Sequence, residues 1–403
     1  MRHVVVMIAT SYPRFPGDGV GSFMEPIAKR VAARGHDVHL VAPWHPRLRR
    51  QAVEDGVSFH FFRYAPASLS VFGYASGMRA DTELRAAAWA VAPLALASGI
   101  WKARRVATKR RATVVHAHWV IPGGVIGAAA CGRLPLVVSL HGSDVFVAER
   151  HRVLGGAARA VFARAAWVTA CSDDLRARAI ALGAAGARSE TVPYGVDTIR
   201  FAPDPAARRE VRETLRLGDG PVVFAAGRLV HKKGFEFLIE AATRLAARFP
   251  SLQVLIAGDG DLGPALADRA VRGGHRVRLL GTQPQDRIAR LAAAADVIAV
   301  PSVHDAAGNV DGLPNFALEA LASGTPVVAS AVGGLPQAIE DGLTGRLVPE
   351  RDAAALAAAI GDLLRQPDVA AQMGRWARQR IERDFGWDRV AERFEHAYDR
   401  AQS

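Results

Sequence analysis

Short apolar runs alternate with longer amphipathic stretches along most of this chain. The apolar runs are bounded by Gly, Pro or Asp, which is typical of strands buried in a parallel sheet. Clear examples lie at residues 3–9, 38–42, 222–226, 252–257 and 296–301. Between the runs, apolar residues recur every three or four positions, as along 23–34 and 353–364, which predicts amphipathic helices. The alternation of strand and helix predicts an α/β protein with mostly parallel sheets.

The same alternation occurs twice. It stops at the Pro-rich and charged span 201–220, which is typical of a linker, and starts again at residue 222. We therefore expect one domain over 1–202, a second over 203–380, and a separate C-terminal helix over 381–403.

Composition narrows the class of protein. With 403 residues and 50% apolar content, the chain can bury two cores. Its two cysteines, Cys131 and Cys171, form no disulfide framework and lack metal-ligand spacing. The first nine residues form an expected strand rather than a signal peptide, and no run of about 20 apolar residues predicts a membrane span. We expect a cytoplasmic protein.

The charge is concentrated in the first half. Residues 1–200 carry 26 Lys and Arg against 13 Asp and Glu, whereas residues 201–403 carry 25 against 26. A basic half favours an anionic partner such as lipid headgroups, phosphorylated acceptors or nucleic acid. An Arg- and Ala-rich composition from a GC-rich genome is the alternative explanation.

One stretch concentrates this charge next to apolar residues. No acidic residue occurs between Arg85 and Ser143, and an Ala-rich run with Trp89 and Trp101 leads directly into six cations. These cations are Lys102, Arg104, Arg105, Lys109, Arg110 and Arg111. The pattern suits a helix lying in an anionic membrane interface. An ordinary helix with a solvated basic end fits it equally.

Two Gly-containing turns follow strands of the second half. After 222–226, Arg228 and Lys233 can both be directed at one diphosphate, with a planar fork from Arg and a point charge from Lys. After 252–257, residues 258–263 formally match the dinucleotide fingerprint Gly-x-Gly-x-x-Gly. The ribose-binding acid expected about 20 residues later is missing, because Arg and Leu occupy that region, so a dinucleotide enzyme is disfavoured.

A polar loop and a helix fill the span 305–328. The helix is expected to start at Pro314 and to stop at Gly324, so its N-terminal backbone N–H groups can bind an anion such as phosphate. Asp311 lies just before this helix and Glu319 lies inside it. A carboxylate at that place can accept hydrogen bonds from vicinal sugar hydroxyls, although a solvated Glu on a crossover helix is the simpler explanation.

Polar residues also follow strands of the first half. Expected strands at 113–118 and 136–140 bring His116, His118 and His141 to one sheet edge, without the spacing of a zinc site. Glycines in the loop 10–21 permit close approach of backbone to a substrate. Either feature is compatible with a purely structural role.

Taken together, these strings resemble the retaining glycosyltransferases of family 4, and the resemblance covers nearly the whole chain. The span 305–328 resembles the family's Glu-x7-Glu region, with Asp311 in place of the first Glu, and Tyr194 replaces Asn in a Pro-Asn-Gly-Val-Asp string. The resemblance implies a GT-B fold: two facing Rossmann-like, doubly wound domains with a cleft between them, and a last helix that crosses back to the first domain.

The resemblance also implies roles for individual residues. The implied catalytic residues are His141, Arg228, Lys233, Asp311 and Glu319. The implied donor-binding residues are Gly19, Gly21, Gly227, Gly258, Gly260, Leu313, Pro314, Asn315 and Phe316. The implied acceptor-side residues are His116, His118 and Asp144. No metal or other cofactor is expected.

The implied reaction moves a hexosyl unit from a UDP- or GDP-hexose to an acceptor hydroxyl of a glycolipid, lipid-linked saccharide or polysaccharide precursor, with retention. Front-face and covalent routes both stay open, so no nucleophile is assigned. A nucleotide-sugar epimerase or isomerase on the same fold is the alternative enzyme. Binding of nucleic acid is disfavoured, because the basic stretch has no recognition module. The inner face of the membrane is a candidate docking surface.

Overall fold

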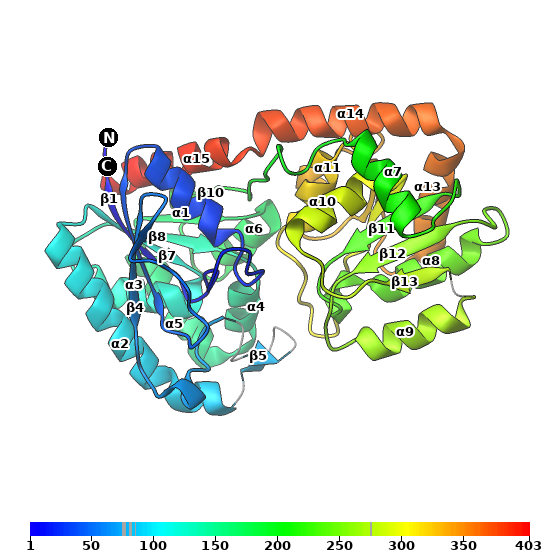
Figure 1. Ribbon diagram of the computed structural model, residues 1–403. Helices are drawn as coiled ribbons and strands as arrows, with labels where there is room; N and C mark the ends of the chain where they lie inside the picture. Colours follow the sequence, from blue (N-terminus) through cyan, green and yellow to red (C-terminus); the bar gives the residue numbers. More distant parts are fainter. Residues whose placement is uncertain (75–77, 80–82, 85, 275) are drawn as a thin grey trace. The chain divides into compact units, whose positions relative to one another are not determined.

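The computed structural model describes residues 1–74, 78–79, 83–84, 86–274 and 276–403 (Figure 1). The chain divides into two compact units. The N-terminal unit consists of Met1–Tyr194 and Trp387–Ser403, and the C-terminal unit consists of Gly195–Gly386. Each is built on a parallel sheet with Rossmann-like topology, which confirms the predicted α/β class.

The sheet of the N-terminal unit has eight strands in the order β10-β9-β8-β7-β1-β2-β4-β3. Neighbouring strands pair in parallel except β3 with β4. The strands are β1 (Val4–Ile8), β2 (Asp37–Pro43), β3 (Val53–Glu54), β4 (Val57–Phe62), β7 (Val114–His118), β8 (Leu136–Leu140), β9 (Trp167–Ala170) and β10 (Ser189–Thr191). A separate antiparallel pair joins β5 (Met78–Arg79) to β6 (Glu83–Leu84).

The helices of this unit include one from the far end of the chain. They are α1 (Met24–Ala33), α2 (Ala86–Arg110), α3 (Val125–Ala130), α4 (Ser143–Arg150), α5 (Arg152–Arg164), α6 (Asp173–Ala181) and α15 (Trp387–Gln402). Figure 1 shows α15, in red, beside α1. Val390, Phe394 and Tyr398 of α15 are buried with residues of α1, β1 and β2 in one hydrophobic core. The last helix therefore completes the core of the first unit.

The C-terminal unit has a six-stranded parallel sheet in the order β13-β12-β11-β14-β15-β16. Its strands are β11 (Val222–Ala226), β12 (Gln253–Ala257), β13 (Val277–Leu279), β14 (Val297–Val300), β15 (Val327–Ser330) and β16 (Arg346–Val348). Its helices are α7 (Pro205–Thr214), α8 (Phe235–Leu245), α9 (Gly263–Arg272), α10 (Gln285–Ala294), α11 (Asn315–Ala322), α12 (Leu335–Ala338), α13 (Ala353–Arg365) and α14 (Pro367–Asp384). Apolar residues of α8 and α13 pack on one face of the sheet.

The apolar pattern located most of these elements to within a few residues. Strand β4 begins at Val57, because Asp55 and Gly56 before it both take positive φ angles in a tight turn. Residues 86–110, which contain both tryptophans of the basic stretch and most of its cations, form the long helix α2, and residue 85 lies outside the described residues. Within the described part of the chain, no helix combines enough length and apolar character to cross a membrane.

Candidate active site

Three loops meet at the carboxyl edge of the C-terminal sheet. They follow β11, β14 and β15, which are adjacent strands, so their first residues lie at the same end of the sheet. Ligands of open α/β sheets bind outside this edge. The loops contain Arg228, Lys233, Asp311 and the start of α11, so the topology brings most of the predicted donor-site residues to one place.

The loop after β11 is held by the loop after β12. The backbone N–H of Gly227 donates to the oxygen of Ala257, and that of Leu229 donates to the oxygen of Asp259. A Cβ on Gly258 would collide with the carbonyl oxygen of Gly227, and one on Gly260 would collide with the backbone of Leu229. The glycines of this apparent dinucleotide fingerprint thus have a local explanation, because the two loops of the protein approach each other closely.

Two lysines of the turn His231–Lys233 share one carboxylate. The Nζ of Lys232 lies 3.1 Å from Oδ1 of Asp311, and the Nζ of Lys233 lies 2.6 Å from Oδ2. Burial would raise the pKa of Asp311, but the charges of Lys233 and Lys232 outweigh burial and hold this pKa well below its ordinary value. Sequence reasoning missed Lys232 and this pairing. Arg228 is exposed at the start of the same loop.

The helix α11 presents Glu319 to this edge. The helix begins at Asn315, one residue later than predicted, with Pro314 in the N-cap position. Gly324 follows its end with a φ of +72°, as predicted. Burial raises the pKa of Glu319 to about 7, against a hydrogen bond from Gln285 and the positive charges of Arg200 and Lys233. A carboxylate with this pKa changes its charge near neutral pH.

The residues around the start of α11 are mostly buried. Leu313 and Phe316 belong to the core, and the ring of Phe316 packs edge-on against Phe224 with 5.5 Å between centroids. The Oδ1 atom of Asn315 is buried and has no hydrogen-bond partner among the described residues. A hydrogen-bond donor of a bound substrate would pair with this oxygen, since buried polar atoms are seldom left unpaired.

In the N-terminal unit, an aromatic cluster surrounds His141 at the carboxyl edge of the sheet. Its Nδ1 lies 2.9 Å from the hydroxyl of Tyr194, and its Nε2 lies 3.0 Å from Nδ1 of His118. Phe23 and Trp119 also contact the ring of His141, each with 4.8 Å between centroids. Burial lowers the pKa of His141 to about 3, so its imidazole is neutral at physiological pH and can act as a hydrogen-bonding group.

His116 and Asp144 are built into the protein interior. Both ring nitrogens of His116 are occupied, with Nδ1 2.8 Å from the Tyr398 hydroxyl and Nε2 2.7 Å from Oγ of Ser139. The Asp144 carboxylate accepts hydrogen bonds from the backbone N–H groups of residues 120, 141 and 142. Asp144 therefore fixes the backbone beside His141. His118 is fully buried, and its Nε2 has no partner within the described residues.

The glycine loop after β1 is organised by an ion pair. The Asp18 carboxylate accepts hydrogen bonds from the backbone and the guanidinium of Arg14, at 2.9 and 2.6 Å. Gly19 beside it is exposed, and Gly21 is partly buried with a φ of +63° near the backbone of Ser11. The loop is thus fixed while the backbone of Gly19 stays accessible.

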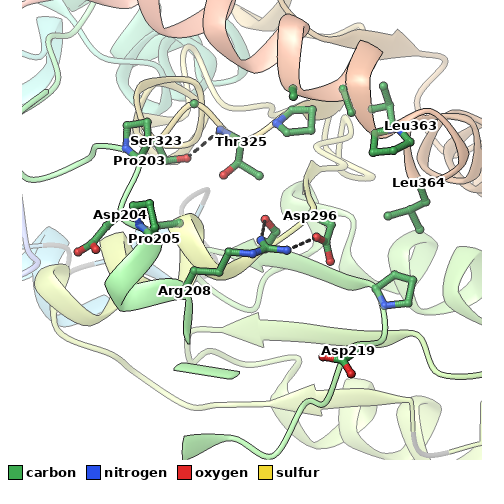
Figure 2. Close-up of a pocket in the computed structure, with 18 residues that line it drawn as sticks. Pro203, Asp204, Pro205, Arg208, Asp219, Asp296, Ser323, Thr325, Leu363 and Leu364 are labelled. Carbon is green, nitrogen blue, oxygen red and sulfur yellow. Dashed lines mark hydrogen bonds and ion pairs between the residues drawn. The ribbon is translucent and has the colours of Figure 1, made fainter. Parts of the chain in front are cut away.

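A cavity of about 460 Å³ lies at the opposite edge of the C-terminal sheet (Figure 2). Residues just before β11, β14 and β15 line it, including Pro221, Asp296 and Thr325. Asp296 is engaged by Arg208, Arg212 and the backbone N–H of Val222. The cavity lies at the opposite end of the strands from the site at the carboxyl edge, and Arg208 pairs with Asp296 in its wall.

Comparison with known proteins defines the class. Residues 220–366 match the family model described as glycosyl transferases group 1, and residues 17–200 match that of glycosyltransferase family 4. The HepE protein of Anabaena, solved in complex with UDP, superposes with a TM-score of 0.78 over 99% of this chain and 100% of that one, at 21% identity. The fold is that of a GT-B glycosyltransferase.

Two curated relatives make the assignment more specific. Glycogen synthase of Mycobacterium tuberculosis is 31% identical over 96% of this chain and 92% of its own length. The GDP-mannose-dependent alpha-(1-6)-phosphatidylinositol monomannoside mannosyltransferase of Mycolicibacterium smegmatis is 39% identical over 61% of this chain, and the match spans 65% of that enzyme. The chain belongs to the group 1, family 4 glycosyltransferases. The epimerase alternative finds no support.

Proposed function

We propose that this glycosyltransferase moves a hexosyl unit from a nucleoside-diphosphate sugar to an acceptor hydroxyl, with retention of anomeric configuration. The observation that carries the proposal is the cationic turn of Arg228 and Lys233 at the carboxyl edge of a parallel sheet, next to Glu319. The relatives supply the donor class, because one is named for GDP-mannose and a structural neighbour was solved with UDP. These names support a UDP- or GDP-hexose as the donor.

The electrostatics of this turn suit departure of a diphosphate. Negative charge builds on the leaving group as the sugar becomes oxocarbenium-like. Arg228 and Lys233 would stabilise this charge, because both cations lie in the loop before the reaction begins. The N-terminal N–H groups of α11 add a positive dipole end at the same edge. Glu319 would accept hydrogen bonds from vicinal hydroxyls of the transferred sugar.

The reaction is tested by product analysis. The protein is incubated with a panel of UDP- and GDP-hexoses, each with and without saccharide or lipid-linked acceptors. We expect nucleoside diphosphate to appear with an acceptor-linked sugar whose anomeric configuration matches the donor, as read by NMR. An inverted linkage would refute retention. A sugar nucleotide isomerised without transfer would refute the proposal itself.

We further propose that α2 docks the enzyme on an anionic membrane, where a glycolipid or lipid-linked acceptor resides. Ala88, Val91 and Ala95 face the interior, while Trp89, Leu94 and Trp101 are 47%, 61% and 56% exposed. The guanidinium of Arg105 lies 5.2 Å from the ring centroid of Trp101. Large apolar side chains thus stand on the outer surface of the helix directly before its basic end, as in helices that lie in a membrane interface.

The docking surface is tested by removing its charge. Changing Arg104, Arg105, Arg110 and Arg111 to Gln is expected to weaken binding to phosphatidylglycerol vesicles on the order of 10²–10³-fold, because each cation near such a surface contributes about 1 kcal/mol. The measurement is vesicle co-sedimentation at low salt. The matched control changes four other exposed arginines of the same unit, Arg133, Arg150, Arg152 and Arg188, to Gln. Equal loss in both variants, or no binding by the native protein, would contradict the proposal.

A further inference from the structure

The pairing of two lysines with one carboxylate is the feature of the donor site that the sequence did not predict. The side chains of Lys232, Lys233 and Asp311 are 9%, 16% and 12% exposed, so water screens their charges weakly. Two ammonium groups and one carboxylate leave a single net positive charge. That charge is what a diphosphate encounters at this end of the site.

The backbone holds the three side chains together. The N–H of Val303, in the loop after β14, donates to the carbonyl oxygen of Lys232 at 2.9 Å, which joins the lysine turn to that loop. Asp311 lies farther along the loop after β14. A Cβ on Gly333, in the loop after β15, would collide with the carbonyl oxygen of Asp311, so the loop after β15 packs directly on Asp311. Packing of three loops therefore sets the position of Asp311 between the lysines.

We propose that Lys232 is a positioning residue that balances the charge of Asp311, so that the charge of Lys233 remains available to a nucleoside diphosphate. With Lys232 absent, the carboxylate would neutralise Lys233 alone and the net charge would fall to zero. With Asp311 neutral, the net charge would rise to two. The inference rests on the proposed function, because it takes Lys233 as a diphosphate ligand.

Charge balance by Lys232 predicts a different set of affinities from direct binding of phosphate by Lys232. Lys232→Met should weaken binding of UDP, GDP or ADP by about 10-fold or more, because it cancels the charge presented to the phosphates. Asp311→Asn should tighten binding of the same nucleotide. The double variant restores one net positive charge, so its affinity should return to within about threefold of native.

The measurement is isothermal titration calorimetry with UDP, GDP and ADP on the full-length native protein and the three variants. A Lys232 that itself binds phosphate would leave the double variant as weak as Lys232→Met. An Asp311 that serves only the sugar would leave nucleotide affinity unchanged in Asp311→Asn. Either result overturns the inference. If Lys232→Met has a much lower melting temperature than the native protein, the single variant Asp311→Asn still tests the inference. It must then bind the nucleotide more tightly than the native protein does.

Lys233→Ala separates this inference from the proposed function. Weaker nucleotide binding in Lys233→Ala together with no rescue in the double variant would end the charge-balance inference and leave the phosphate site in place. Unchanged binding in Lys233→Ala, or no binding of any of the three nucleotides by the native protein, would overturn both.

Discussion

Lys233→Ala and Arg228→Ala are each expected to lower the transfer rate at saturating donor by roughly 10²–10³-fold, the usual cost of removing one preorganised charge-stabilising donor. Both residues lie in the loop after β11, at the edge where the diphosphate is proposed to bind. Their contacts should strengthen as the diphosphate departs, so the loss falls on kcat as well as on donor affinity. The measurement is steady-state kinetics of nucleoside-diphosphate release with saturating acceptor.

The folded state should tolerate both changes. Lys232 remains to pair with Asp311 when Lys233 is removed, and Arg228 is exposed, so the melting temperature without donor is expected to change little. Arg272→Ala removes an exposed arginine of the same unit, on α9, and serves as the matched control. Near-native turnover of Lys233→Ala or Arg228→Ala at saturating donor would overturn the assignment of that residue to the diphosphate site.

Glu319→Gln should weaken donor binding by roughly 10- to 100-fold, because hydrogen bonds to a charged group contribute about 1.5–3 kcal/mol. It should also remove a pH dependence. Since burial raises the pKa of Glu319 to about 7, the native carboxylate loses its charge as pH falls through 7. Donor affinity should therefore fall between pH 8 and pH 6 in the native protein and stay flat in the Gln variant.

The comparison with Asp311→Asn makes this prediction sharper. Asp311 pairs with two lysines, whereas Glu319 has the raised pKa of a buried carboxylate, so Glu319→Gln should impair use of the donor more than Asp311→Asn. Calorimetric affinity for a hydrolysis-resistant analogue of the donor and transfer rates with the donor itself are compared under one set of conditions. A larger loss in Asp311→Asn would mean that the shorter carboxylate makes the main contact with the sugar.

The strands and helices could be predicted because they depend on local patterns. Buried parallel strands require continuous apolar runs, and the helices end at residues such as Gly324 whose backbone preference is local. The Gly258 region shows the limit of such patterns. Its spacing matches a dinucleotide fingerprint, but the collision that excludes a Cβ involves the carbonyl oxygen of Gly227, which only the folded chain brings near.

The chemistry around the predicted site residues depends on distant parts of the chain. The hydroxyl that occupies His116 comes from Tyr398, and the carboxylate that pairs with Lys232 comes from Asp311. Nothing in the local sequence of either residue indicates these partners. The sequence pattern predicted that His116 lies at one edge of the sheet. All five residues of β7 are nevertheless buried, and the second hydrogen-bond partner of His116, Ser139, lies on the neighbouring strand β8.

The packing of α15 in the core of the N-terminal unit affects the order in which the two units can fold during synthesis. During synthesis, the N-terminal unit emerges early but lacks Phe394 and the Tyr398 hydroxyl that binds His116 until α15 has left the ribosome. All residues of the C-terminal unit, 195–386, emerge before this helix. The unit that begins the chain is thus the last to be completed. A chimera that exchanges donor specificity between relatives should replace only 195–386 and keep 387–403 with its own N-terminal unit.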